Sequence, residues 1–314
     1  MQPLFLEPVF KERIWGGTEL RKEFGYDIPT DHTGECWAIS AHPNGPSVIA
    51  NGPFAGVTLD KLWDEHPEVF GHPKEEVFPL LTKILDANMD LSVQVHPDDS
   101  YAKVHENGEL GKTECWYIID CKEDADMIFG HNAKTKEELV QQMNEGNWEE
   151  LLRRVKIKPG DFFFVPSGTI HALCEGTLVL ETQQSSDTTY RVYDYGRRDA
   201  DGNLRDLHLE KAIDVTTVPH EGYVTVPKTE SNGDTTVTTY VESDFFSVYK
   251  WDVNGTTTFH FNDDYLLVSV IKGEGKLIHQ GENYSLHKGS HFIIPVGFGE
   301  FELTGDCQLI VSHK

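Results

Sequence analysis

The feature that most constrains the fold is a strand-turn-strand pattern that occurs twice in the chain. The first copy, PGDFFFVPSGTIHAL, spans residues 159–173, and the second, GSHFIIPVGFGEFEL, begins at Gly289. Each copy has a glycine, a proline six positions later and a second glycine two positions after the proline. Proline restricts φ and glycine accepts positive φ, so each copy predicts two short strands joined by a tight turn. A repeated unit of this kind predicts two related β-domains in one chain.

The two copies differ three positions after the second glycine, where the first has His171 and the second has Glu300. A histidine that enters a strand directly behind a tight turn has a fixed ring direction inside a barrel, which suits a metal ligand. A buried histidine that is only hydrogen-bonded in the core explains the same pattern. Glu300 lies between Phe298 and Phe301 and has no His-x-His pair ahead of it, so we expect the second copy to be structural.

The two copies, together with the VIKGEG turn over residues 270–275, resemble the cupin superfamily. This resemblance implies a mainly β fold with two jelly-roll barrels. We expect a catalytic cupin domain over residues 1–226, with a small helical insertion at about residues 134–155, and a degenerate, non-metal-binding cupin domain over residues 234–314. The polar segment 226–236, which has no periodicity, marks the boundary between them.

Apolar runs between turn residues predict the strands of the first domain. These runs lie at residues 34–40, 78–95, 114–119 and 178–192, and the second of them contains a turn at 88–90. Cap residues predict short helices at 18–25 and 58–69. Thr135 with Glu138 forms a capping box and a second helix begins at Asn147, so a helical pair interrupts the first barrel.

The chain is strongly acidic, with 52 Asp and Glu residues against 27 Lys and Arg residues and a formal net charge of -25. Such a surface repels phosphate backbones and anionic lipids, which excludes nucleic acids and anionic membranes as partners. A small anionic ligand stays compatible with this charge if a few cations are concentrated around it. Basic residues near a candidate site are therefore informative in this protein.

Segment and cysteine patterns favour a cytoplasmic protein. The 314 residues contain no run of 18 or more apolar residues and no charged-then-apolar amino terminus, so we expect neither a membrane span nor a signal peptide. The five cysteines form no CxxC pair and are odd in number, which predicts reduced, mostly buried thiols.

Three segments of the first domain supply candidate metal ligands, which are His96, Glu114 and His171. Two neutral imidazoles and a carboxylate suit a divalent cation, and three protein ligands leave a position for water or substrate, as in catalytic zinc sites. The same set forms the facial triad of non-haem Fe(II) enzymes, so the residues alone do not select the metal. Gln94 precedes His96 by two residues on the same strand face, where it is either a fourth ligand or a hydrogen-bond partner of the ligands.

Two cations accompany these candidate ligands. Lys112 precedes Glu114 by two residues and shares its strand face if the strand begins that early. Arg191 follows Glu181 by ten residues, and this even spacing places both on one face if no bulge intervenes. Cations next to a metal in a strongly acidic protein indicate a phosphorylated or otherwise anionic substrate, with a surface ion pair as the alternative role of each residue.

Several motifs resemble the type I mannose-6-phosphate isomerases in their short bacterial form. They are PVFK, IWGG, FPLLTKILDA, VQVHPDD, GKTECWY, PSGTIHAL and ETQQSSDTTYRVYDYGR, and the resemblance covers nearly the whole chain. It implies one zinc ion per chain, with ligands at His96, Glu114, His171 and, as a fourth, Gln94. It also implies a catalytic arginine at Arg191 and a substrate-site lysine at Lys112.

The implied reaction interconverts mannose 6-phosphate and fructose 6-phosphate through a cis-enediol. The sugar ring must open, and a proton must leave the carbon next to the carbonyl and return one carbon along. We expect Arg191 to stabilise the enediolate and Lys112 to assist ring opening or to hold an oxygen. Glu181 is the first candidate for the base because burial raises a carboxyl pKa, and a role as partner of His171 or Arg191 is the alternative. Candidates for substrate and phosphate contacts are Ser92, Asp187 and Arg191.

Two other functions remain open. A non-haem iron cupin dioxygenase uses the same three ligands, consumes oxygen and needs an apolar pocket, but it leaves Lys112 and Arg191 without a task. A non-catalytic cupin that binds a sugar phosphate would show no exchange of the C2 proton with solvent. We expect a small-molecule partner, and no nucleic acid, membrane or obligate protein partner.

Overall fold

The computed structural model describes residues 1–199 and 201–314. The strands of its first part are β1 (Leu4–Glu7), β2 (Val9–Gly17), β3 (Thr33–Ile39), β4 (Val48–Ile49), β5 (Leu80–Ala87), β6 (Val93–Val95), β7 (Glu114–Cys121), β8 (Asp126–His131), β9 (Leu152–Lys156), β10 (Phe162–Val165), β11 (His171–Leu173), β12 (Thr177–Gln184) and β13 (Tyr190–Tyr193). The later strands are β14 (Lys228–Asn232), β15 (Thr235–Glu242), β16 (Ser247–Phe261), β17 (Leu266–His279), β18 (Glu282–His287), β19 (His291–Ile294) and β20 (Gly299–His313).

The helices are few and all of those described precede β14. They are α1 (Glu19–Phe24), α2 (Leu59–Glu65), α3 (Asp99–His105), α4 (Lys136–Glu145), α5 (Trp148–Leu151) and α6 (Leu209–Val215), with 3₁₀ turns η1 (Gly52–Phe54) and η2 (Pro67–Phe70). Over the described residues, every helix is too short or too polar to cross a membrane. The mainly β architecture is as predicted.

The first part of the chain forms a sandwich of two antiparallel sheets. One sheet has six strands in the order β10-β7-β12-β5-β3-β2, and the other has five in the order β13-β6-β11-β8-β9. Their inner faces share a core in which Trp116 and Val179 of the six-stranded sheet pack with Met127, Phe129 and Leu173 of the five-stranded sheet. The space between these sheets also holds the polar residues described below.

The second part of the chain forms a nine-stranded sheet that curves around a core of its own. Its order is β14-β15-β16-β20-β17-β19-β1-β4, with β18 paired to β17. The core contains Trp251, Phe292 and Phe301. Because β1 pairs with β19 and with β4, the amino-terminal strand belongs to this sheet. The domain limits 1–226 and 234–314 stay a prediction.

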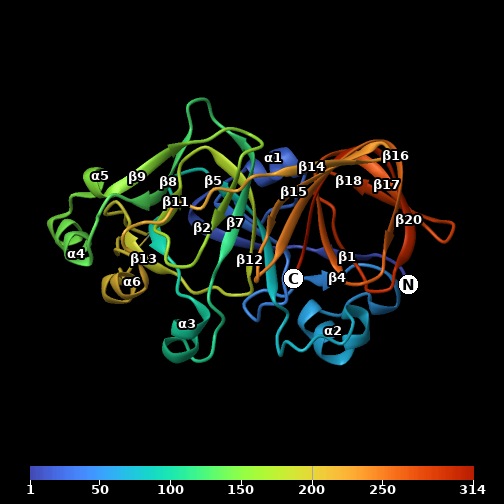
Figure 1. The fold of residues 1–314 in the computed structure, drawn as a ribbon, viewed down its shortest axis with the longest axis horizontal. Coiled ribbons are helices and arrows are strands. Elements are labelled where there is room, and N and C mark those ends of the chain that lie inside the picture. The colour runs from blue at the N-terminus through green and yellow to red at the C-terminus, as the bar shows by residue number, and fades with distance from the viewer. Residues whose placement is uncertain (200) are drawn as a thin grey trace.

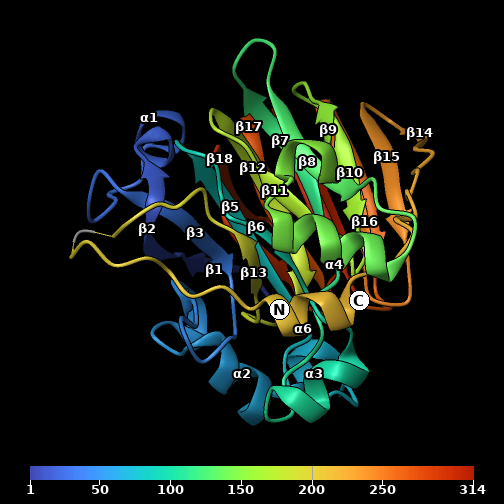
Figure 2. The same cartoon turned by 90° about the vertical axis from the view of Figure 1, so that its left-hand side faces the viewer.

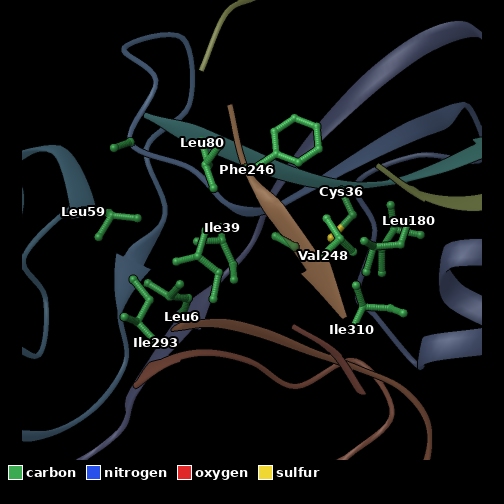
Figure 3. Packing of buried hydrophobic residues seen from close by; sticks show 14 of the residues in the cluster. Leu6, Cys36, Ile39, Leu59, Leu80, Leu180, Phe246, Val248, Ile293 and Ile310 are labelled. Atoms are coloured by element: carbon green, nitrogen blue, oxygen red, sulfur yellow. The ribbon is translucent and has the colours of Figure 1, made fainter. Parts of the chain in front are cut away.

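The outer face of the six-stranded sheet packs against the second sheet, so the two halves lie side by side (Figure 1). This interface is apolar and fully buried, with Cys36 and Leu180 on one side and Phe246, Val248 and Ile310 on the other (Figure 3). Truncating a buried phenylalanine to alanine costs about 3–5 kcal/mol. The interface therefore holds the two halves in a fixed relative position.

Helices α4, α5 and α6 cover the outer face of the five-stranded sheet (Figure 2). Leu139, Met143 and Ala212 of these helices are buried in one cluster with Val93 and Ala172 of the sheet. Half of the capping box predicted for α4 is present, because Glu138 N donates to Thr135 Oγ1 at 3.2 Å, whereas Glu138 Oε2 accepts from Lys134 N at 2.7 Å rather than from the N–H of the cap residue Thr135. The five-stranded sheet is thus packed on both faces, which makes β6 and β11 rigid supports.

Some sequence expectations need correction. The two strands expected within 78–95 are present as β5 and β6, and they lie in opposite sheets, whereas the run 178–192, expected to continue one sheet, divides into β12 and β13 of opposite sheets. The helix expected at 58–69 ends at Glu65, because Pro67 disfavours helical backbone at the residue before it. Helices α3 and α6 were not predicted, and the segment expected to be irregular at 226–236 contains the β14–β15 hairpin.

Candidate metal centre and active site

Three side chains from both sheets of the first sandwich meet in its interior. His96 follows the end of β6, Glu114 begins β7 and His171 begins β11, and all three are at most 1% exposed. Glu114 Oε1 lies 3.2 Å from His171 Nε2, and Glu114 Oε2 lies 3.6 Å from His96 Nε2. One nitrogen or oxygen atom of each of the three lies within 4.8 Å of the others. The structure therefore brings together the three residues singled out as ligands.

Backbone carbonyls orient both imidazole rings. His96 Nδ1 donates to Thr188 O at 2.8 Å, and His171 Nδ1 donates to Thr169 O at 2.8 Å. Because a carbonyl oxygen only accepts, each Nδ1 carries the proton and each Nε2 presents a lone pair to Glu114. Burial lowers the pKa of His96 well below its usual value and lowers the pKa of His171 to about 4, so both rings are neutral near pH 7.

This arrangement fits a bound divalent cation. His96 Nε2 and Glu114 Oε1 are buried and have no hydrogen-bond donor among the described residues. Leaving a buried acceptor without a donor costs about 1–3 kcal/mol, and here several lone pairs converge on one point. Two neutral imidazoles and one carboxylate form the donor set of a catalytic zinc site, which keeps a position for a further ligand.

Gln94 lies at the centre of β6, in register with His171 of β11 and with Arg191 of β13. Residues paired in this way share one face of a sheet, so the three side chains lie side by side. The Gln94 amide nitrogen is 3.3 Å from His171 Nε2. A half-turn of the amide presents the carbonyl oxygen at the same place, so the geometry allows both a fourth ligand and a hydrogen-bond partner.

Lys112 lies beside the centre for a reason that differs from the one predicted. Strand β7 begins only at Glu114, so Lys112 belongs to the preceding loop rather than to the strand face. Its Nζ is nevertheless 3.0 Å from Glu114 Oε2, and the side chain is buried. Burial alone would lower the pKa of Lys112, but the Glu114 and Glu181 carboxylates outweigh it and raise the pKa. The amine therefore stays a charged donor.

Glu181 lies on the inner face of β12 and is 3% exposed. Its Oε2 accepts from Trp116 Nε1 at 3.0 Å, and its Oε1 lies 3.5 Å from Lys83 Nζ. Burial raises the pKa of Glu181, the Glu114 carboxylate adds to this, and Lys112 and Lys83 oppose it. A buried carboxyl with a raised pKa is suited to accept and return a proton.

The sequence interpretation missed that Glu181 belongs to a row of charged side chains on the inner face of the six-stranded sheet, which also contains Lys83 and Glu35. Lys83 of β5 pairs in register with Glu181 on one side and with Trp37 of β3 on the other. Glu35 accepts from Arg13 at 2.7 Å and from Trp37 at 2.6 Å, and it lies 4.0 Å from Lys83. The lysine inside the apolar run FPLLTKILDA was the signal, because a lysine within a buried strand requires a carboxylate partner.

Arg191 approaches the centre from the opposite sheet to Glu181. The expectation that both lie on one strand face is wrong, because β12 ends at Gln184 and the chain enters the other sheet at β13. Arg191 Nη1 donates to Asp206 O at 2.7 Å, while its Nε is buried without an acceptor among the described residues. Burial, and next the charge of Arg205, lower the pKa of Arg191. The usual pKa of an arginine is so high that the guanidinium nevertheless stays protonated.

Cations are concentrated near Arg191. Asp194 accepts from Arg197 Nη2 at 2.5 Å and from Arg205 Nη2 at 2.6 Å, and both arginines are close enough to lower the pKa of Arg191. With Arg191, this group has more positive than negative side chains. Ser92, which is 4% exposed, directly precedes β6 and thus lies two residues from Gln94. In a chain with a net charge of -25 this local excess is distinctive.

A cleft of about 1170 Å³ lies beside the centre. Asp187 and Thr188 line it, and Thr188 is the residue whose carbonyl orients His96. Most of its charged lining is acidic, including Asp60, Asp64, Glu75, Glu76, Glu106 and Glu109. Among the described residues, none of the three candidate ligands lines the cleft, which adjoins the centre through Asp187 and Thr188. The carboxylates repel a phosphate group from the cleft itself.

The chain matches two sequence models of known protein families. The model described as "Phosphomannose isomerase type I, catalytic domain" matches residues 4–118. The model described as "Mannose-6-phosphate isomerase, cupin domain" matches residues 236–314. The two matches lie in the first sandwich and in the second sheet, respectively, apart from the strands β1 and β4 that join the second sheet.

Individual relatives match along the whole chain. A protein of Bacillus subtilis named "Probable mannose-6-phosphate isomerase" is 62% identical over 311 residues, covering 99% of each chain. The mannose-6-phosphate isomerase ManA of the same organism is 57% identical over 312 residues, again covering 99% of each chain. The crystal structure of a mannose 6-phosphate isomerase from Bacillus subtilis superposes with a TM-score of 0.99 at 58% identity, covering all of both chains.

Proposed function

Because the chain belongs to the type I mannose-6-phosphate isomerase family, we propose that it interconverts mannose 6-phosphate and fructose 6-phosphate through a cis-enediol. The observation that carries this proposal is the convergence of His96 Nε2, His171 Nε2 and the Glu114 carboxylate, whose buried acceptors a divalent cation would satisfy. We place the reaction in the cytoplasm, with a small sugar phosphate as the substrate.

One zinc ion per chain is the proposed cofactor, held by His96, Glu114 and His171, with Gln94 as the candidate fourth ligand. The donor set supports zinc, since imidazoles and a carboxylate at a site with a position to spare suit this ion. When bound, zinc acts as a Lewis acid that stabilises negative charge developing on the sugar oxygens by several kcal/mol. Isomerisation requires no redox change, which also suits zinc.

Glu181 is the proposed base. It would take the proton from C2 of the open-chain aldose and return it to C1, while a second proton passes from the C2 hydroxyl to the C1 oxygen, so that the composition of the sugar is unchanged. Its raised pKa supports this role, and the Trp116 N–H and the Lys83 ammonium hold the carboxylate in one orientation. Lys112, which stays protonated, would donate to a sugar oxygen during ring opening.

Arg191 would stabilise the enediolate and, with Ser92, contact the anionic end of the substrate. Its Nε is buried and has no acceptor among the described residues, so a donor is available for a substrate oxygen. The neighbouring Arg197 and Arg205 make this side of the centre the electrostatically favourable place for a phosphate, whereas the carboxylates of the cleft disfavour it. Asp187, at the cleft, would contact the sugar hydroxyls.

The decisive experiment combines metal analysis with an activity assay. We expect the purified chain to contain about one zinc ion and to convert mannose 6-phosphate to fructose 6-phosphate, with activity lost in chelator and restored by zinc. Activity that survives complete metal removal would contradict the metal role. Zinc binding without isomerisation or C2 proton exchange would favour a sugar-phosphate-binding protein, and Fe(II) with oxygen consumption would favour a dioxygenase.

A further inference from the structure

We propose that Gln183 is a positioning residue that holds the turn at residues 184–188, and through this turn orients both the metal-ligand ring of His96 and the side chain of Asp187. The link to His96 concerns metal binding alone. The link to Asp187 rests on the proposed function, because it matters only if Asp187 contacts the substrate.

Gln183 is fully buried on the inner face of β12. It is in register with Glu114 of β7 and lies two residues after Glu181, so it shares the face that carries both carboxylates. Its Nε2 donates to Gln184 O at 2.8 Å and to Ser186 O at 2.6 Å. Its Oε1 is buried without a donor among the described residues. The amide therefore uses both of its N–H groups on the turn that follows its own strand.

The turn held by Gln183 connects the six-stranded sheet to the five-stranded sheet. Ser186 is fully buried, its N–H donates to Gln184 O at 2.7 Å, and Thr188 N donates to Ser186 Oγ at 3.3 Å. Thr188 O then accepts from His96 Nδ1 at 2.8 Å. A chain of hydrogen bonds thus runs from the Gln183 amide, through Ser186 and Thr188, to a candidate metal ligand.

Asp187 lies within the same turn, at the edge of the cleft. On the far side its Oδ2 accepts from Asn44 Nδ2 at 3.1 Å, and both of these side chains are exposed. An exposed hydrogen bond is a weak restraint because water competes for it. The buried pair of hydrogen bonds from Gln183 is the stronger restraint on the position of Asp187.

Removing these two hydrogen bonds leaves Ser186 O without the Gln183 donor, while Gln184 O keeps the Ser186 N–H. The start of the turn stays held by Gln184 N to Thr113 O and Ser185 N to Pro79 O, so the restraint is lost mainly from Ser186 to the Thr188 carbonyl. Partners that orient a metal-ligating histidine typically contribute 10–100-fold to metal affinity or activity. A residue that only stabilised the turn would change the melting temperature without changing metal release.

The test uses the full chain with zinc alone as the probe. Gln183→Met keeps the length of the side chain but removes both donors, and we expect zinc transfer to a chromophoric chelator to become about 10-fold faster or more. Thr82→Val is the matched control, because Thr82 is a buried residue of the adjacent strand whose hydroxyl lacks a hydrogen-bond partner in the described part of the chain. Should Gln183→Met fail to fold, Gln183→Leu serves the same purpose.

Unchanged zinc release in a folded Gln183 variant would overturn the inference while leaving the proposed function intact. A wild-type chain that binds no zinc would overturn the proposed function itself. For Asp187, kcat/KM is measured in Gln183→Met, Asp187→Asn and the double variant. Less than multiplicative losses support the coupling between the two residues, and independent losses overturn it.

Discussion

The two copies of the strand-turn-strand unit share the conformation of their two turn glycines but have different surroundings. Gly160 and Gly289 have φ values of 91° and 90°, and Gly168 and Gly297 have values of 80° and 67°. Glycine is favoured at all four positions because such φ values are strained for other residues. Three residues after the second glycine, however, His171 is 1% exposed and Glu300 is exposed. The turn residues therefore determine the backbone of the turn, and the neighbouring strands determine whether the residue after it is buried at a candidate site or exposed to solvent.

The neighbouring strands account for this difference. In the first copy, β11 pairs with β6 and β8 and faces Glu114 of the opposite sheet across the sandwich. In the second copy, β20 lies between β16 and β17, and Glu300 reaches solvent. The first copy thus has a candidate metal site because two sheets present donors to a shared interior, and the second copy lacks such an interior at Glu300.

Exchanging the matched positions for alanine should give the largest contrast between the copies. His171→Ala removes a ligand, so we expect loss of bound zinc and a fall in kcat/KM of roughly 10³-fold or more, about 4 kcal/mol of barrier. Glu300→Ala removes an exposed side chain and should change neither quantity. Metal content and kcat/KM of both variants check this. Retained zinc and activity in His171→Ala would contradict the proposed centre.

The variant Arg191→Ala tests whether a residue near the first copy contributes to catalysis without holding the metal. We expect the variant to keep its zinc while kcat falls about 10²-fold, because one donor to the developing negative charge is lost. Metal analysis and steady-state kinetics measure the two effects separately. A normal kcat would remove Arg191 from the mechanism.

The two turn glycines should differ in how much stability a methyl group removes. A Cβ at Gly168 would lie 2.5 Å from Thr217 Oγ1 and 2.9 Å from Val215 O, whereas a Cβ at Gly297 would meet only Met1 Cε at 3.7 Å. We expect Gly168→Ala to lower the free energy of unfolding by about 3 kcal/mol and Gly297→Ala by about 1 kcal/mol, the strain of left-handed backbone alone. Urea unfolding of both variants gives the difference. Equal losses would show that backbone strain dominates at both sites.

His291 of the second copy occupies the position of Phe162 in the first, and it predicts an effect of pH on stability that only the second copy contributes. It is buried, its Nδ1 and Nε2 bond Ser269 and Tyr26, and burial lowers its pKa to about 3. The unfolded chain binds a proton at this histidine with a pKa of about 6.5, whereas the folded chain does not until the pH is near 3. The free energy of unfolding is therefore unaffected by this group well above pH 6.5 and decreases as the pH falls from 6.5 towards 3.

We therefore expect the wild type to lose about 1.6 kcal/mol through this group between pH 6.5 and pH 5. His291→Phe cannot bind the proton and should lose less stability over the same range. Urea unfolding at the two pH values measures the change, and the difference between pH values removes the constant effect of the lost hydrogen bonds. Parallel losses in both proteins would exclude His291 as the cause.

The candidate ligand residues could be predicted because local sequence patterns mark them. The hydrogen bonds and ion pairs around them could not be predicted in this way. His171 follows a tight turn, Glu114 begins an apolar strand and His96 ends one, so residue types suited to metal binding were visible in isolated segments. The hydrogen bond from His96 to Thr188 O could not be predicted from the sequence, because every residue has a backbone carbonyl. Lys83 was visible in the sequence as a lysine inside an apolar strand, but only the structure shows that its partner is the Glu181 carboxylate.

By itself, the sequence determined the repeated turns, the mainly β class and the residue types that could hold a metal, because turn glycines and strand alternation act over a few residues. Only the tertiary structure decided that β12 and β13 lie in opposite sheets, that Glu181 and Arg191 therefore approach from two sides, and that β1 joins the second half. These outcomes depend on strand pairing between distant segments, and that pairing is selected by burial of whole faces rather than by local preference.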